Sequence, residues 1–156
     1  MTHSRDREAM AYVHRLRALT VELNLLGSEF ATRNGLHSTD LQALICLLDA
    51  VRSGTPPTPG WLGSQLGISS ASTTALVDRL EATGLLARTR DTEDRRRVLV
   101  TVTPRAEELG WSFFGPLIGR VVDVIDTFSP GEQQTISTFL ARMQDAASDA
   151  RDLHRS

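Results

Sequence analysis

The sequence predicts a mainly α-helical protein with a single β-hairpin. Apolar residues recur every three or four positions along most of the chain, as they do on one face of a helix. A short alternating pattern, typical of strands, appears between residues 85 and 103. With 156 residues, of which 40% are apolar, the chain is long enough for one folded domain, so we expect one compact structural unit.

The first half of the chain contains three expected helices. The first runs from Ala9 to about Gly35, a residue that can take the left-handed conformation that ends a helix. The second begins near Ser38 or Thr39 and ends at Gly54; Thr39 and Gln42 stand at the spacing of a capping box. The proline-rich segment 55–60 interrupts the helical pattern and precedes a short helix that closes at Gly67.

A fourth helix, a hairpin and two further helices follow. Ser69 is the expected N-cap of a helix that stops at Gly84. The strands, residues 85–90 and 97–103, flank a polar tip. Pro104 and Pro130 stand at first-turn positions of the last two helices, the second of which has a capping box formed by Ser129 and Glu132. The middle elements therefore describe a winged helix-turn-helix.

Positive charge is concentrated in one short stretch of the chain. The formal net charge is −2, yet residues 79–105 hold seven arginines against four acidic residues. The chain contains no lysine, so all 17 cationic side chains are arginines, which suit bidentate contacts to phosphate and guanine, although a biased genome composition explains this equally well. The local excess is what a phosphate-binding surface requires.

Helical geometry divides residues 69–84 into two faces. An advance of 100° per residue places one set together as the expected core face, namely Thr73, Leu76, Val77, Leu80 and Gly84. The opposite face is available for a DNA groove and contains Ser70, Ala71, Thr74, Ala75, Asp78 and Ala82. Few of these side chains are long, so we expect base reading to depend on serine and threonine hydroxyls and on methyl contacts to thymine.

This layout resembles the MarR family of bacterial regulators over roughly residues 9–145. The motifs that carry the resemblance are Leu76-Val77-Asp78-Arg79-Leu80-Glu81, Gly84-Leu85-Leu86 with Arg88, Asp91 with Asp94-Arg95-Arg96, and Val100 with Val102-Thr103. Each motif is weak alone, but their order and spacing are specific. The chain departs from the family at Ala71 and Ala75, where relatives frequently carry long polar or basic side chains.

The resemblance implies a homodimer that binds double-stranded DNA. Residues 1–36 and 104–156 would form the helical dimerisation region, and residues 37–103 the DNA-binding lobe. Arg95 would enter the minor groove, and Asp94 would support the wing against Arg88 or a neighbour. The DNA-contacting residues we expect are Ser69, Ser70, Ala71, Ser72, Thr74, Ala75, Arg79, Arg95, Arg96 and Arg97, with Asp78, Arg88 and Asp94 as wing support.

Alternative interpretations of these residues remain. A run such as Arg95-Arg96-Arg97 is commonly a solvated turn, and an internal ion pair that orients the wing would explain Asp78 and Arg79 equally well. The hairpin and helices would also suit a winged-helix module that contacts other proteins without sequence-specific DNA binding. No Ser/His/Asp set, metal-ligand cluster or phosphate-binding glycine loop indicates an enzyme or a cofactor.

The resemblance further implies a pseudo-palindromic operator, repression, and a small lipophilic or aromatic-acid effector. Cys46 admits a redox-sensing alternative, although its apolar neighbours favour a buried, inert thiol. A lone cysteine and the lack of a long apolar run agree with a cytoplasmic location away from membranes. The candidate effector-pocket residues are Leu26, Phe30, His37, Cys46, Trp111 and Phe114, for most of which core packing is the simpler interpretation.

Overall fold

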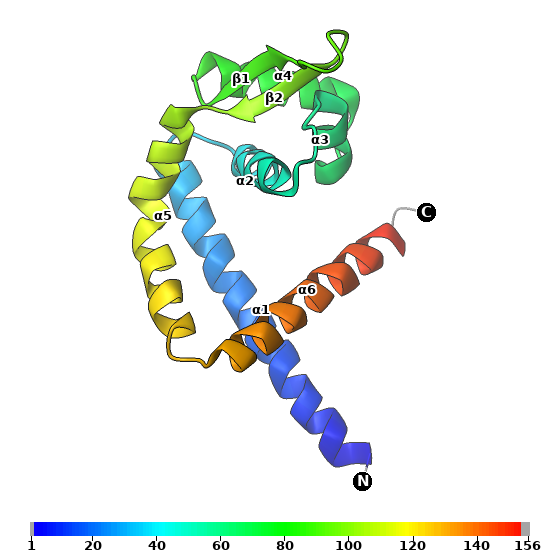
Figure 1. The fold of residues 1–156 in the computed structure, drawn as a ribbon, viewed down its shortest axis with the longest axis vertical. Helices are drawn as coiled ribbons and strands as arrows, with labels where there is room; N and C mark the ends of the chain where they lie inside the picture. Colours follow the sequence, from blue (N-terminus) through cyan, green and yellow to red (C-terminus); the bar gives the residue numbers. More distant parts are fainter. Residues whose placement is uncertain (1, 154–156) are drawn as a thin grey trace. The chain divides into compact units, whose positions relative to one another are not determined.

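The computed structural model describes residues 2–153 as six helices and one antiparallel hairpin (Figure 1). This architecture confirms the predicted mainly α-helical class. The elements in chain order are α1 (Thr2–Arg33), α2 (Ser38–Ser53), α3 (Pro59–Leu66), α4 (Ser70–Ala82), β1 (Leu86–Arg90), β2 (Val98–Val102), α5 (Pro104–Ile125) and α6 (Pro130–Leu153).

The contacts between residues divide the chain into two compact units, residues 1–110 and residues 111–156. The first unit holds α1 to α4, the hairpin and the start of α5. The second holds the rest of α5 together with α6. The assignment of residues 1–36 and 104–156 to dimerisation and of 37–103 to DNA binding remains a prediction.

The start expected for the first helix was wrong, and so was the capping contact expected for the second, which does begin at Ser38. Helix α1 begins at Thr2 rather than Ala9, because the polar residues before Ala9 include no helix breaker even though they lack apolar spacing. Helix α2 has His37 as its N-cap, and the backbone N–H of His37 donates to Asp40 Oδ2 at 2.9 Å. The capping contact is therefore made by Asp40, and the box expected from Thr39 and Gln42 does not form.

The core of the first unit lies where α2, α3, α4 and the hairpin meet. Its fully buried side chains include Leu47 of α2, Leu62 of α3, Leu80 of α4 and Val100 of β2. Strand β1 pairs antiparallel with β2, with Arg88 opposite Val100. The backbone N–H of Val100 also donates to the carbonyl of Pro57 at 2.8 Å, so the proline-rich segment is attached to the hairpin edge. The position of α4 relative to the hairpin is thus fixed by shared apolar packing.

The second unit has no buried side chain among residues 111–153. Its helix α6 begins with the expected capping box, in which the Ser129 hydroxyl and backbone N–H both donate to Glu132 Oε2. The hydroxyl bond is the main reason that the pKa of Glu132 is lowered, and the backbone bond adds to it. This helix start is well formed, yet the helices leave most of their apolar residues exposed.

Helices α3 and α4 approach each other most closely at Gly63 and Thr73. A Cβ atom on Gly63 would overlap Thr73 Oγ1. Thr73 is 3% exposed and its hydroxyl donates to the carbonyl of Ser69 at 2.9 Å, so the side chain cannot simply rotate away. Glycine at position 63 is therefore required for this helix crossing.

The Gly63→Ala variant should lose about 1–3 kcal/mol of unfolding free energy because its methyl group overpacks the crossing. Urea denaturation at matched protein concentration measures the loss. In a Thr73→Ala background, the Gly63→Ala substitution should cost much less unfolding free energy, because the Thr73 hydroxyl that it would overlap is absent. Gly60→Ala is the matched control, since a Cβ atom there meets no atom within 4 Å. Equal effects at positions 60 and 63 would contradict the proposed overlap.

Candidate nucleic-acid interface

Helix α4 has one buried face and one exposed face, as its sequence predicts. Ser69 is the N-cap, and its hydroxyl accepts a hydrogen bond from the backbone N–H of Ser72 at 3.2 Å. The buried side chains are Thr73, Leu76, Val77 and Leu80, which confirms the expected core face except for Gly84, which lies beyond the end of α4 and is half-buried. The exposed residues of the other face are Ser70, Ala71, Ser72, Thr74, Ala75, Asp78 and Ala82. The candidate base-reading residues are thus accessible, and their contacts to DNA remain a prediction.

The tip of the hairpin, residues 91–97, is held by Asp91. Asp91 is 8% exposed, and its Oδ1 accepts a hydrogen bond from the backbone N–H of Glu93 at 3.0 Å. Its Oδ2 lies 3.4 Å from Nε of Arg97, and the backbone N–H of Asp91 donates to the carbonyl of Arg97. Of the three tip arginines, Arg97 is therefore attached to the base of the turn.

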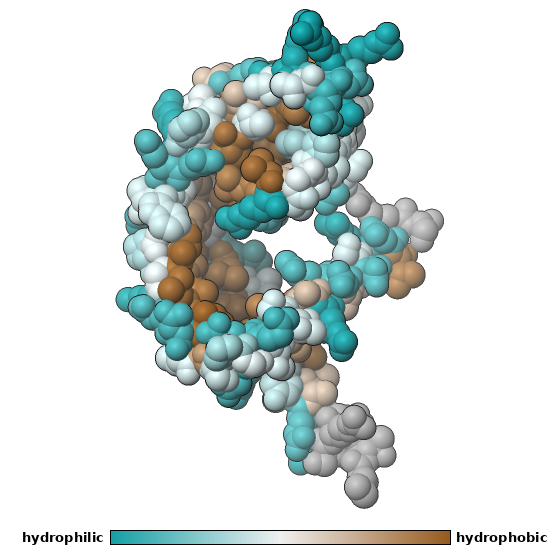
Figure 2. Space-filling model, viewed as in Figure 1, coloured by the Kyte–Doolittle hydropathy of each residue, from teal (hydrophilic) through white to brown (hydrophobic). Residues whose placement is uncertain are grey.

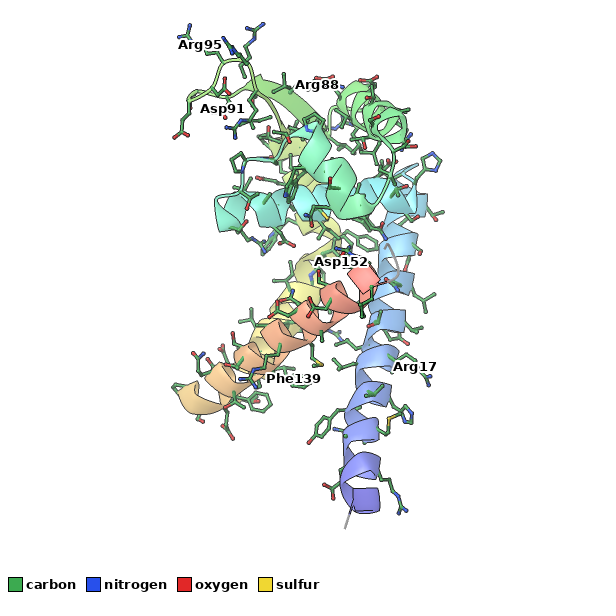
Figure 3. The ribbon with its side chains drawn as sticks, turned by 90° about the vertical axis from the view of Figure 1, so that its right-hand side faces the viewer. Arg17, Arg88, Asp91, Arg95, Phe139 and Asp152 are labelled. Carbon is green, nitrogen blue, oxygen red and sulfur yellow. The ribbon has the colours of Figure 1, made fainter. Side chains whose placement is uncertain are left out.

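Arg95 and Arg96 are exposed at this tip. Among the described residues, neither side chain forms an ion pair. Figure 3 shows the Arg95 side chain projecting outward beyond the strands. Asp94 shapes the turn locally, since its Oδ1 accepts a hydrogen bond from the backbone N–H of Arg96 at 3.0 Å. Two guanidinium groups are consequently available to an external anion.

Arg88 of β1 connects the hairpin to α4. Its Nη2 lies 2.5 Å from Asp78 Oδ1, and its Nη1 contacts Glu81 Oε2. The hydrogen bond to Asp78 is the main cause of the raised pKa of Arg88. Of the two partners expected for Asp94, Arg88 or a neighbour, the structure has the neighbour: Asp94 accepts from the backbone N–H of Arg96, and the acids that hold Arg88 belong to α4.

Arg79 and Asp78 are both engaged in ion pairs, although not with each other. Arg79 donates from Nε and Nη2 to the two carboxylate oxygens of Asp40 on α2, at 3.2 and 2.5 Å. These hydrogen bonds raise the pKa of Arg79, while partial burial lowers it. The Asp40 side chain is fully buried, whereas that of Arg79 is 39% exposed. A DNA contact by Arg79 remains a prediction, but its guanidinium has an internal partner.

Sequence reasoning left three of the acids that pair with arginines in this region out of the site, namely Asp40, Glu81 and Asp91. Asp40 stood three residues after His37, at capping-box spacing, but Thr39 was the more familiar capping residue. Glu81 was visible three residues after Asp78, one helical turn away and on the same side of α4. The third missed acid, Asp91, is the first residue of the tip and resembles an Asx-turn residue.

The six candidate effector-pocket residues are divided between the two units. In the first unit, Phe30 is 2% exposed, Leu26 and Cys46 are half-buried, and His37 is exposed. In the second unit, Trp111 is exposed, and Phe114 packs edge-on against Phe113 with ring centroids 4.9 Å apart. Cys46 packs against the buried core of the first unit, as does Trp61. A common pocket for the six residues remains a prediction.

Two general findings concern metals and membranes. Within residues 2–153, no three His, Cys, Asp or Glu side chains are grouped so that they could hold a metal ion. No helix in the same part of the chain has both the length and the apolar character that a membrane span requires.

Comparisons with known proteins agree with this geometry. Residues 34–97 match the model of the MarR family. An uncharacterized HTH-type transcriptional regulator, YcgE of Bacillus subtilis, is 32% identical over 143 residues, which are 92% of this chain and 90% of the relative. A solved MarR family protein from Bacillus stearothermophilus is similar with a TM-score of 0.64 and 24% identity, covering 92% of this chain and 97% of that one.

A crystal structure of an S. aureus MepR–DNA complex is also similar, with a TM-score of 0.56 and 17% identity over 84% of this chain and 96% of that one. At this identity the likeness concerns the fold alone. The family model and the 32% identity to YcgE over nine-tenths of both chains go further, and they point to a transcriptional regulator, not to an enzyme. The chain belongs to the MarR family of winged helix-turn-helix transcriptional regulators.

Proposed function

We propose that this regulator binds double-stranded DNA through helix α4 and the tip of the hairpin. The observation that carries the proposal is that Arg95 and Arg96 are exposed and form no ion pair in the described structure. They lie on the hairpin that Arg88 links to α4. A rigid hairpin can hold guanidinium groups at backbone distance while a helix reads bases. The MepR–DNA complex shows that a protein of this fold binds DNA. Such a function places the protein in the cytoplasm.

The proposal includes a homodimer. Helices α5 and α6 expose a set of large apolar side chains, and Figure 2 shows brown, apolar surface along α5. A monomer rarely leaves so much apolar surface in water. The exposed members in the second unit include Ile118, Val121, Val122, Val124, Phe128, Phe139, Leu140 and Met143. Two-fold symmetry would then present two α4 helices to a pseudo-palindromic operator, with half-sites about one helical turn apart.

Solution mass and DNA binding test the proposal together. Light scattering should give about twice the chain mass of 17.1 kDa at micromolar concentration. Footprinting on the protein's own promoter region should show a two-fold protected site whose affinity falls steeply with salt. A stable monomer would exclude the dimer. Binding that is insensitive to salt, or absent, would favour the alternative of a winged-helix module that contacts other proteins.

Ligand response and repression complete the proposal. An effector that binds one arrangement of the dimer better than another would change its affinity for the operator. A panel of benzoic acids added to the footprinting reaction tests this, with loss of protection as the expected result. Protection unchanged across the panel, with DNA binding intact, would remove aromatic acids from the proposal. A reporter gene behind the same promoter should become more active when the regulator is deleted.

The Arg88 ion pairs lead to a prediction about charge. Arg88 pairs with Asp78 and Glu81, so its single positive charge offsets one of the two negative charges on the helix proposed to face DNA. The Arg88→Gln variant should bind duplex DNA about tenfold more weakly, because two uncompensated carboxylates lie within a Debye length of the phosphates. Fluorescence anisotropy with a labelled duplex at fixed salt measures the change.

The triple variant Arg88→Gln/Asp78→Asn/Glu81→Gln provides the control, since it removes all three charges while keeping similar side-chain shapes. It should recover at least the affinity that Arg88→Gln loses, because Arg88, Asp78 and Glu81 together carry a net charge of −1 in the wild type and the variant carries none at these positions. Affinity that stays low in the triple variant would mean that Arg88 acts by contacting DNA or by holding the hairpin, and not by neutralising the acids.

A further inference from the structure

The exposed hydroxyls of α4 differ in what they can offer a ligand. Thr74 Oγ1 donates its proton to the carbonyl of Ser70 at 3.0 Å. A hydroxyl has one proton and two lone pairs, so Thr74 is left with acceptor capacity alone. The same side chain carries a methyl group, and the residue is exposed. Thr74 can therefore receive a hydrogen bond from a ligand without giving up its bond within the helix.

Ser72 has the opposite character. The Ser69 hydroxyl accepts from the backbone N–H of Ser72 and donates its own proton to Ser72 Oγ at 3.0 Å. The proton of Ser72 is consequently available to an external acceptor. Since every base pair presents an acceptor in the major groove, a serine donor by itself selects no base. Selection must come from Thr74 and from the apolar residues around it.

Ala71 and Ala75 lie close to Thr74 on the helix surface. Ala71 stands three residues before Thr74 and four before Ala75, the spacings at which side chains on a helix are neighbours. All three residues are exposed and carry a methyl group. Guanine is most commonly read by arginine or lysine, and the arginine nearest this surface, Arg79, stands four residues after Ala75 and donates to both carboxylate oxygens of Asp40. The face thus combines one hydrogen-bond acceptor with a small apolar surface.

We propose that Thr74 is a specificity-determining residue that selects an A·T base pair, an inference that rests on the proposed binding of duplex DNA. In the major groove, adenine donates from its N6 amino group, and thymine carries a C5-methyl group. Thr74 accepts from N6, and Ala71 and Ala75 pack against the methyl group. Guanine offers no donor at this edge, and cytosine offers a donor without a methyl group. A·T therefore satisfies both features of the face.

A selection from a pool of random duplexes tests the proposal. The wild-type protein should enrich an A·T pair at one position in each half-site, by about tenfold over the other pairs. The Thr74→Val variant, which keeps the shape but lacks the acceptor, should lose most of this preference and keep only the part that the methyl contact of Ala71 and Ala75 supplies, while the salt dependence of binding stays the same. The Thr74→Ser variant keeps the hydroxyl and should retain the adenine. An unchanged preference in Thr74→Val would overturn the proposal.

A uracil substitution in the DNA tests the proposed methyl contact separately from the hydrogen bond to Thr74. Replacing the selected thymine by uracil removes only the C5-methyl group and should weaken wild-type binding about fourfold, the effect of exposing one methyl group. Binding unaffected by uracil would exclude the contact with Ala71 and Ala75. A wild-type protein that retains no duplex from the pool would contradict the proposed DNA binding itself, which is a different outcome from binding without the A·T preference.

Discussion

Replacing Arg95 and Arg96 with alanine is expected to lower the affinity for duplex DNA by at least about a hundredfold near physiological salt. A dimer would lose four guanidinium groups, each of which contributes to phosphate or minor-groove binding. Because these side chains are exposed and form no ion pair in the described structure, the folded state loses little by their removal. The effect should therefore appear in binding and be small in thermal unfolding.

The salt dependence identifies the mechanism. The slope of log affinity against log salt should fall by about one for each phosphate-contacting arginine removed. The Arg15→Ala/Arg17→Ala variant is the matched control, since it changes the net charge equally at exposed positions on α1 whose side chains also form no ion pair with described residues. It should keep most of the affinity. A control that loses as much as Arg95→Ala/Arg96→Ala would mean that net charge, rather than the hairpin tip, governs binding.

The sequence was sufficient to predict the elements because their signals are local. Gly54, Gly67 and Gly84 all have positive φ at the ends where helices were expected to stop, and Ser69 and Ser129 cap the helices they precede. The face of α4 followed from the helical period alone. These features depend on neighbours within a few residues, which is why one sequence revealed them.

The ion pairs of the site could not be predicted in the same way. Arg79 lies 39 residues from Asp40 in the sequence. For Arg88, both Asp94 and Asp78 were possible partners, and only the direction of the strand and the side of the sheet on which Arg88 lies select Asp78. Opposite charges in a sequence offer many pairings of similar energy at the surface. Only the tertiary arrangement selects one, so the candidate residues could be predicted from the sequence while the pairings between charged residues could not.

The ion pair between Arg79 and Asp40 should respond unequally to the loss of its two members. The Asp40 side chain is fully buried, and it receives hydrogen bonds from Arg79 and from the backbone N–H of His37. The Arg79→Met variant leaves this carboxylate buried without its cation, which costs about 2–4 kcal/mol of unfolding free energy. Asp40→Asn should cost less, since Arg79 is 39% exposed and can turn its charge toward water.

The double variant Asp40→Asn/Arg79→Met separates charge from packing. This variant should be more stable than Arg79→Met, although one more native residue has been replaced. The reason is that no buried charge is left, and the introduced amide can still accept a hydrogen bond from the backbone N–H of His37. Urea unfolding of the four proteins at one concentration gives the coupling free energy. If the two single variants lose equal amounts of unfolding free energy and the double variant loses their sum, the two side chains do not depend on each other. In that case α2 and α4 are joined by apolar packing alone.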